Sequence, residues 1–444
     1  MNNFLSRVLG RLNLAREKAI KSSLLKQGLG SLGLKVAFTV LRFLTTVIFA
    51  RSLGGVEFGN YILVMSWVTV LTMLASLGME KLSTRETAVL IDREEWSYLN
   101  GFWHWANYLV IAVSCSVSVI ASAIAWGIFG GSNPTLALTF TIGFATVPLM
   151  SSGKLRRGTL RGMHYVILAI LTDGLIMPAL LLLLAVAYHQ LSGEGLTAIA
   201  VMLIYLAVSV VGVGLEIYFK RRNLPTNYQS LPRKYRISEW RKSILPLTLT
   251  SGFAIIYSRA DIIMLGIFLS PVEAGIYAVA VRCTLPIQFL LLVVIGTINP
   301  RVAKLYASND TKKLQKLVRI TARVTSVTAI LLTAGIWLFR VQLLSLFGPE
   351  FVIGTTVLSI LCVEKLIDVV TGVSISLLHM TGNEGFSTKV SSSTAMLNIL
   401  LNALLIPQWG ISGAAIATTI SVASCNIILS FAAYKRVGIN PFPI

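Results

Sequence analysis

Three arginines stand inside long apolar segments of this chain, and a lysine lies seven residues before the first of them: Arg42, Arg259, Arg282 and Lys35. An isolated cation at mid-bilayer costs about 2.5 to 3.5 kcal/mol on insertion scales, so it usually faces a water-filled cavity or a bound anion. A guanidinium group binds two oxygens of a phosphate at once. We therefore expect these four residues to form a cationic, substrate-binding cavity, with a kink at Pro286 beside Arg282.

Four carboxylates occupy similar apolar segments: Asp173, Asp261, Glu364 and Asp368. A carboxylate in a low-dielectric medium tends to take up a proton, which makes all four candidates for ion coupling. Two alternatives stay open. Asp173 and Asp261 are also available as structural ion-pair partners for the arginines. Lys365 is spaced to pair with Asp368 at i,i+3, which would make the Glu364 region a static charge cluster.

The remaining residues predict neither a metal site nor a cofactor. The four cysteines and four histidines are scattered, without the spacing that metal ligands share. The pattern Gly28-x-Gly30-x-x-Gly33 matches a dinucleotide fingerprint, but it precedes a membrane segment and follows no strand. The net charge of +20 is divided by membrane side and forms no soluble basic motif, so nucleic acid is not an expected partner.

Membrane helices are the elements that must position these charges. Of the 444 residues, 55% are hydrophobic and 13% are charged, against about 25% charged in soluble proteins. Most of the apolar segments have the roughly 17 to 25 residues that a spanning helix needs. We expect an all-α polytopic protein with twelve spans, at 32–53, 58–79, 102–129, 135–151, 166–188, 196–219, 244–269, 274–298, 320–339, 351–378, 390–406 and 411–433.

The distribution of basic residues predicts the topology. Most of the 38 lysines and arginines fall on connecting segments of one side, which the positive-inside rule assigns to the cytoplasm together with both termini. The predicted organisation is a cytoplasmic interfacial amphipathic segment, an N-terminal six-helix bundle, a basic cytoplasmic linker, a C-terminal six-helix bundle and a cytoplasmic tail. These occupy residues 1–31, 32–219, 220–243, 244–433 and 434–444.

The loops after the first and seventh spans repeat each other. Residues 53–61 read LGGVEFGNY and residues 269–277 read LSPVEAGIY, which share five of nine positions at an offset of 216 residues. Each half holds an even number of spans, so both halves insert with the same orientation. We expect two bundles related by a pseudo-two-fold axis along the membrane normal, with the substrate path between them.

Three classes of function compete on these grounds. A flippase for an anionic headgroup on a lipid tail needs a hydrated cationic groove, because phosphates and sugar hydroxyls find no hydrogen-bond partner in hydrocarbon. An ion-coupled exporter of cationic drugs would need carboxylates, and not arginines, as the main charged groups of its cavity. A membrane glycosyltransferase or ligase would need large outer loops, and the outer segments here are short.

The stretch from Lys26 to Tyr61, with Gly78 and the Thr84-Arg85-Glu86 segment, resembles bacterial polysaccharide-biosynthesis flippases of the O-antigen type. These belong to the multidrug/oligosaccharidyl-lipid/polysaccharide exporter superfamily. The resemblance implies a transporter and not an enzyme, which moves polyprenyl-diphosphate-linked oligosaccharide repeat units to the outer leaflet by alternating access, for surface polysaccharide synthesis. It also implies a bacterial inner-membrane location, with membrane lipids and polysaccharide polymerase or assembly proteins as partners. An ion-coupled multidrug or metabolite antiporter of the same superfamily is the alternative.

Overall fold

In the computed structural model every regular element among the described residues is a helix, with no strand among them. It describes all residues except 1, 194, 225–230 and 443–444. The side chains of residues 2–36, 192, 250, 251, 253, 254 and 256 also lie outside the description. The all-α class expected from composition is therefore confirmed for the described part of the chain.

The elements fall on either side of the basic linker. Before it lie α1 (Asn2–Ala75), α2 (Met79–Asp92), α3 (Trp96–Phe129), α4 (Pro134–Ala145), α5 (Val147–Gly162), α6 (Val166–Leu171), the π-helix η1 (Thr172–Ile176), α7 (Met177–Ser192) and α8 (Ala198–Arg222). After it lie α9 (Ile237–Phe268), α10 (Pro271–Cys283), α11 (Leu285–Ala307), α12 (Thr311–Leu338), α13 (Arg340–Ser345), the 3-10 helix η3 (Pro349–Gly354), α14 (Thr355–Thr371), α15 (Val373–Met380) and α16 (Glu384–Val437).

Two of the long helices reverse direction at a glycine. Gly54 interrupts α1 with φ 69° and ψ 173°, and Gly410 interrupts α16 with φ 58° and ψ −138°. Glycine reaches positive φ without the penalty that a Cβ imposes, which permits so abrupt a turn. Each of these helices therefore contains two of the predicted spans. Within the described residues, eight helices are long and apolar enough to cross a membrane, and twelve crossings remain a prediction.

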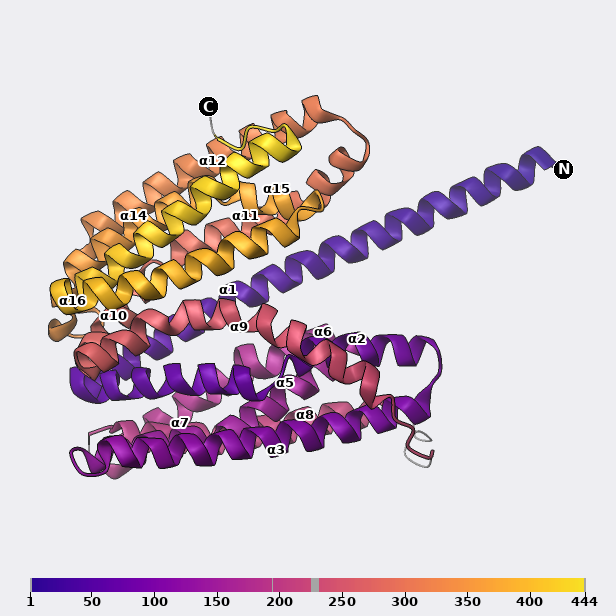
Figure 1. Ribbon diagram of the computed structural model, residues 1–444. Helices are drawn as coiled ribbons and strands as arrows, with labels where there is room; N and C mark the ends of the chain where they lie inside the picture. The colour runs from indigo at the N-terminus through magenta and orange to yellow at the C-terminus, as the bar shows by residue number, and fades with distance from the viewer. Residues whose placement is uncertain (1, 194, 225–230, 443–444) are drawn as a thin grey trace.

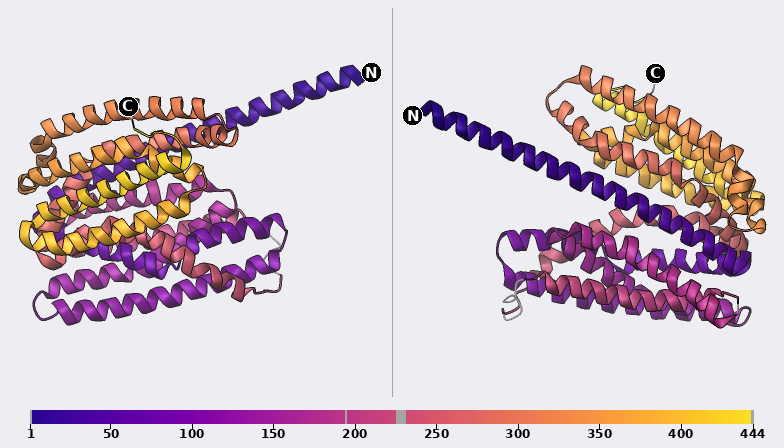
Figure 2. Two further views of the ribbon diagram at one scale, coloured as in Figure 1. Left: turned by 45° about the horizontal axis from the view of Figure 1, so that its top comes forward. Right: turned by 180° about the vertical axis from the view of Figure 1, so that it is seen from behind.

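The helices gather into two lobes (Figure 1). The second arm of α1 and the helices α2 to α8 form the first lobe, and α10 to α16 form the second. Seen from behind, the first arm of α1 runs between the lobes (Figure 2). The lobes meet near the reversal of α1 and separate toward the end that carries the N-terminus. The arrangement resembles a V whose two arms are the lobes.

The repeated loops touch each other where the lobes meet. A Cβ built on Gly59 would lie 2.2 Å from the carbonyl oxygen of Pro271, and one on Gly275 would lie 3.0 Å from the Cα of Gly59. Real Cβ atoms essentially never approach to 2.2 Å, so the contact requires glycine at position 59, and a Cβ at position 275 would be tightly packed. Phe58 packs edge-on against Phe351 beside it, with ring centroids 5.6 Å apart.

A polar contact holds the same end closed. Arg51 Nε donates a hydrogen bond of 2.7 Å to the carbonyl oxygen of Leu346, which lies just after α13. The rings of Phe43 and Phe347 meet edge-on at 5.5 Å between centroids. The first lobe and α1 are thus joined to the second lobe by backbone, aromatic and charge-assisted contacts at one end of the molecule.

Prolines break several helices at mid-length. Proline lacks an N–H group, and its ring clashes with the carbonyl four residues earlier. Pro148 follows the break between α4 and α5, Pro178 follows η1, and Pro286 follows the break between α10 and α11. The kink expected beside Arg282 is confirmed, because α10 ends at Cys283 and α11 begins at Leu285. These breaks lie next to the cavities described below.

Candidate functional site

Arg42 lies on the wall of a cavity of about 330 Å³ in the first lobe. Its side chain, on the first arm of α1, is 51% exposed. Hydroxyl, amine and guanidinium groups line the same cavity, among them Thr45, Tyr61, Lys154 and Arg282. Arg42 therefore faces open, polar space, which is the environment that a cation within a membrane segment requires.

Asp173 lies between two guanidinium groups. Its Oδ2 is 3.7 Å from Arg42 Nη2, and its Oδ1 is 3.8 Å from Arg157 Nη2. The Asp173 side chain is 47% exposed, so these long ion pairs are weak. Arg157 has a closer partner in Glu216 at 2.7 Å, with side chains only 9% and 1% exposed. The pairing of Arg42 with Asp173 that the sequence left open is present, but it leaves both groups accessible.

A π-helix presents Asp173 to the cavity. The segment Thr172–Ile176 is wider than an α-helix and comes just before Pro178, which cannot donate a backbone hydrogen bond to the preceding turn. The carbonyl oxygen of Asp173 accepts a hydrogen bond of 3.4 Å from Arg42 Nη2. Both the backbone and the side chain of this residue therefore orient Arg42.

Arg259 and Arg282 line an adjoining cavity of about 370 Å³. Among the side chains that the structure describes, no carboxylate lies within ion-pair distance of either guanidinium group. Arg282 is close enough to Arg259 and Arg42 for the three charges to repel one another. The open alternative, in which Asp173 or Asp261 neutralises these two arginines, is not what the described part of the chain shows.

Asp261 faces a different set of neighbours. Its carboxylate accepts hydrogen bonds from Tyr277 Oη at 2.6 Å, Thr418 Oγ1 at 2.7 Å and Asn402 Nδ2 at 2.8 Å. The side-chain oxygens of Asn398 and Asn402 are buried and have no hydrogen-bond donor. The carboxylate thus accepts three hydrogen bonds, while α16 carries two amide oxygens that lack a donor, and oxygen atoms are the ligands that hard cations prefer.

The structure corrects one predicted pair. Lys365 was expected to bind Asp368 at i,i+3, but its Nζ lies 3.1 Å from Glu364 Oε2 instead. Asp368 Oδ1 accepts a hydrogen bond of 3.1 Å from Asn426 Nδ2, on the second arm of α16. An amide from a helix distant in sequence thus satisfies Asp368, which leaves Lys365 to its chain neighbour, the buried Glu364.

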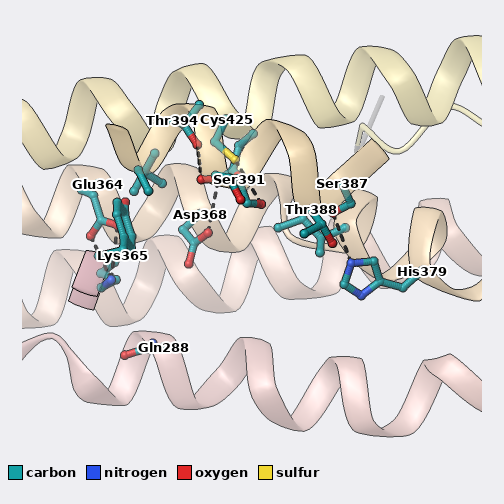
Figure 3. Close-up of a pocket in the computed structure, with 16 residues that line it drawn as sticks. Gln288, Glu364, Lys365, Asp368, His379, Ser387, Thr388, Ser391, Thr394 and Cys425 are labelled. Carbon is teal, nitrogen blue, oxygen red and sulfur yellow. Dashed lines mark hydrogen bonds and ion pairs between the residues drawn. The ribbon is translucent and has the colours of Figure 1, made fainter. Parts of the chain in front are cut away.

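The cavities adjoin one another. Arg42 and Asp173 also line a further cavity of about 330 Å³ beside Arg161. Arg282 lines both the first-lobe cavity and the adjoining one. Glu364 lines the adjoining cavity and a fourth, of about 440 Å³, in the second lobe (Figure 3). Because these cavities share lining residues, the arginines of both halves of the chain lie on neighbouring cavities.

Sequence reasoning missed some residues of this site and named one that the structure does not describe. Lys154 and Arg157 were assigned to a cytoplasmic segment, whereas α5 continues to Gly162 and brings both to the cavity wall. Lys154, Arg157 and Arg161 follow one another at steps of three and four residues, the spacing of one helix face, which was the available signal. The side chain of Lys35 lies outside the description, so its predicted role in the cavity stays a prediction.

The sequence is similar to known protein families and to individual known proteins. The sequence profile described as "Polysaccharide biosynthesis protein" matches residues 25–306, and the profile described as MatE matches residues 246–404. Over 176 residues the chain is 31% identical to the probable low-salt glycan biosynthesis flippase Agl15 of Haloferax volcanii. The aligned region covers 39% of this chain and 37% of that protein. Over 191 residues it is 31% identical to the probable flippase AglR of the same organism, covering 42% and 40%.

The matched region thus spans about two fifths of the length of each of these relatives. Among solved structures, the lipid II flippase MurJ in an inward closed conformation superposes with a TM-score of 0.70 over 90% of this chain and 86% of that one. The sequence identity is 14%, so this likeness shows the fold alone. Because the first profile covers more than half of the chain, the protein belongs to the polysaccharide biosynthesis protein family.

Proposed function

We propose that this multi-pass membrane protein is a flippase that carries a polyprenyl-diphosphate-linked oligosaccharide from the cytoplasmic to the outer leaflet. The observation that carries the proposal is the placement of Arg42, Arg259 and Arg282 on neighbouring cavities, with no carboxylate within ion-pair distance of the last two among the described side chains. Uncompensated guanidinium groups attract an anion, and their geometry suits phosphate. The names of Agl15 and AglR, both flippases, support the same function.

In this proposal the diphosphate lies among the arginines while the polyprenyl tail stays in lipid. Binding removes the phosphates from water, so each must receive hydrogen bonds inside the cavity. The cargo competes with Asp173 for Arg42, because that pair is long and accessible. The lobes separate at the end with the N-terminus, which the charge distribution assigns to the cytoplasm, so the cavities would load from that side.

Alternating access would require the lobes to part at the opposite end. The contacts to be broken there are the glycine contact between the repeated loops, the Phe58–Phe351 pair and the hydrogen bond from Arg51. The two lobes would rock about the cargo, as repeat-built transporters do. The protein thus acts as a transporter, and no covalent chemistry is asked of its residues.

For ion coupling we propose Asp261. The buried amide oxygens of Asn398 and Asn402 beside its carboxylate would complete the coordination of a cation. Asp173 has the different role of competing with the cargo. Glu364 is paired with Lys365, and Asp368 is bonded by Asn426, so we place coupling at neither of them.

The alternative function is export of a cationic drug or metabolite, which the partial MatE match keeps in view. A cation would be repelled by Arg42, Arg259 and Arg282, which is why we favour an anionic cargo. The inner membrane of a bacterium, cytoplasmic termini and an association with polysaccharide polymerase or assembly proteins belong to the same proposal, together with contact to membrane lipids.

Deletion of the gene followed by mass analysis of polyprenyl-linked sugars tests this function. We expect the complete repeat unit on its polyprenyl diphosphate to accumulate, and to accumulate again when Arg259→Ala replaces the wild-type protein. Arg319→Ala, an exposed cation on α12 outside the cavities, is the matched control and should restore normal levels. Unchanged lipid-linked sugars in the deletion strain would contradict the proposal.

A further inference from the structure

The second-lobe cavity has no arginine among its described lining residues, yet it is larger than each of the three cavities described above that arginines line. It measures about 440 Å³, within the range of ligand pockets. Its walls come from α9 and from four helices of the second lobe, α11, α14, α15 and α16. Figure 3 shows the side chains that line it. Charged and amide side chains on its wall are satisfied best by water or by a polar part of a ligand.

Hydroxyl groups cover one wall of this pocket. Thr388, Ser391, Ser392 and Ala395 follow one another at helical spacing along α16 and turn one narrow, polar face toward the cavity. The Thr388 hydroxyl donates its hydrogen to the Glu384 carbonyl, which leaves its lone pairs free to accept. This wall therefore offers groups that both donate and accept.

The opposite walls complete a mixed set of partners. Gln288 from α11 and Asn426 from α16 bring amides, and Asp368 brings a carboxylate. Sugar hydroxyls also donate and accept at once, so hydroxyl, amide and carboxylate groups suit them together. Tyr257 adds an aromatic ring at the edge of the pocket. Among the described lining residues, Lys365 is the one lysine or arginine, and its charge is matched by Glu364.

The pocket lies next to the cavity that holds Arg259 and Arg282. Tyr257, Gln288, Glu364 and Lys365 line both this cavity and the one that holds Arg259 and Arg282. A ligand with its diphosphate among the arginines could therefore extend its uncharged part past Gln288 into the second lobe. The anionic part of the headgroup would bind in the arginine-lined cavity, and its hydroxyl-rich part would bind in the second-lobe pocket.

We propose that the second-lobe pocket is the glycan subsite of this transporter, which holds the distal sugars of the lipid-linked oligosaccharide. This inference rests on the proposed function. The subsite takes neutral or amino sugars in preference to uronic acids, because the carboxylate of Asp368 faces it while the charges of Glu364 and Lys365 cancel. Discrimination among cargoes thus lies in the second lobe, and recognition of the diphosphate lies with the arginines.

Transport of two lipids into the outer leaflet of proteoliposomes tests the subsite. One lipid is the complete repeat unit on its polyprenyl diphosphate, extracted from cells that lack this protein. The other is the single-sugar form, from cells that also lack the second glycosyltransferase. The variants are Ser392→Trp, which fills the pocket, and Thr388→Val, which removes a hydroxyl. Ser393→Trp is the matched control, because Ser393 is exposed and lies off the pocket wall.

We expect Ser392→Trp to lower the rate ratio of complete to single-sugar lipid about tenfold, which corresponds to a loss of about 1.4 kcal/mol. Thr388→Val should lower the ratio less, and Ser393→Trp should leave it at the wild-type value. An unchanged ratio in Ser392→Trp, with protein of normal yield, would overturn the glycan subsite. Arg282→Ala should slow both lipids alike, and if it slows neither, the proposed function itself fails.

Discussion

Replacing Asp173 with Asn should tighten the binding of a diphosphate lipid and not weaken it. The carboxylate holds Arg42 at 3.7 Å and Arg157 at 3.8 Å, so it competes with an incoming phosphate for the same guanidinium groups. Asparagine keeps the shape of the side chain and removes the charge. The cargo would then meet Arg42 without first displacing an internal anion.

The size of the effect follows from distance and exposure. Two unit charges of opposite sign at about 4 Å attract by roughly 4 kcal/mol at an effective dielectric constant of 20. For half-exposed pairs, solvent screening makes the interaction energy much smaller. Measured pairs of this kind contribute about 0.2 to 1 kcal/mol. Removing the competitor should therefore raise affinity by up to about fivefold, while the protein loses little stability.

Calorimetric titration of the purified protein with farnesyl diphosphate, a short soluble probe, measures this change. Arg42→Ala and the Arg42→Ala/Asp173→Asn double variant complete a mutant cycle. The gain from Asp173→Asn should vanish when Arg42 is absent. Equal or weaker binding in Asp173→Asn would refute the competition, and a lost response to an ion gradient with unchanged affinity would mark Asp173 as a coupling residue instead.

Three further predictions concern the packing around the site. Glu216→Ala leaves Arg157 buried without its close partner, which should cost about 3 to 5 kcal/mol and lower the melting temperature in detergent. Gly59→Val introduces a side chain where even a Cβ finds no room, so it should force the lobes apart and raise thiol labelling of a cysteine placed in that contact. Asn402→Ala removes an unsatisfied oxygen beside Asp261 and should weaken the dependence of transport on a cation gradient.

Each of these predictions has a control in the same chain. Gly127→Val lies in open space and should leave thiol labelling unchanged. Arg319→Ala should not alter the melting temperature. A Glu216→Ala protein that melts like the wild type would show that the buried pair does not stabilise the first lobe. Unaltered labelling in Gly59→Val, or unaltered gradient dependence in Asn402→Ala, would contradict the corresponding claim.

Much of the fold could be predicted because the bilayer restricts it. The thickness of the membrane fixes the length of an apolar helix, so hydropathy alone predicts the helical class. The repeated loops at 53–61 and 269–277 indicated two related halves, but the sequence did not show that these loops touch each other, as Gly59 and Pro271 do. The sequence did not indicate that Gly54 and Gly410 would turn their helices back so tightly.

The contacts of the site could not be predicted, because they join residues far apart in the chain. Arg42 meets Asp173 across 131 positions, and Asp261 meets Asn402 across 141. Helical spacing predicted an ion pair between Lys365 and Asp368, but Asn426 donates a hydrogen bond to the carboxylate of Asp368 instead. Spacing along the sequence predicts which side chains of one helix can reach each other. Whether they pair depends on the side chains of neighbouring helices, which the spacing does not reveal.

The claim that cargo is held through its charge is tested most directly by comparing two ligands on purified protein. Farnesyl diphosphate and farnesol share a tail and differ only in the diphosphate. We predict that the wild-type protein binds the diphosphate at least about tenfold more tightly, that salt weakens this binding, and that Arg259→Ala/Arg282→Ala abolishes the preference. Equal affinity of the wild-type protein for the two ligands would contradict the account.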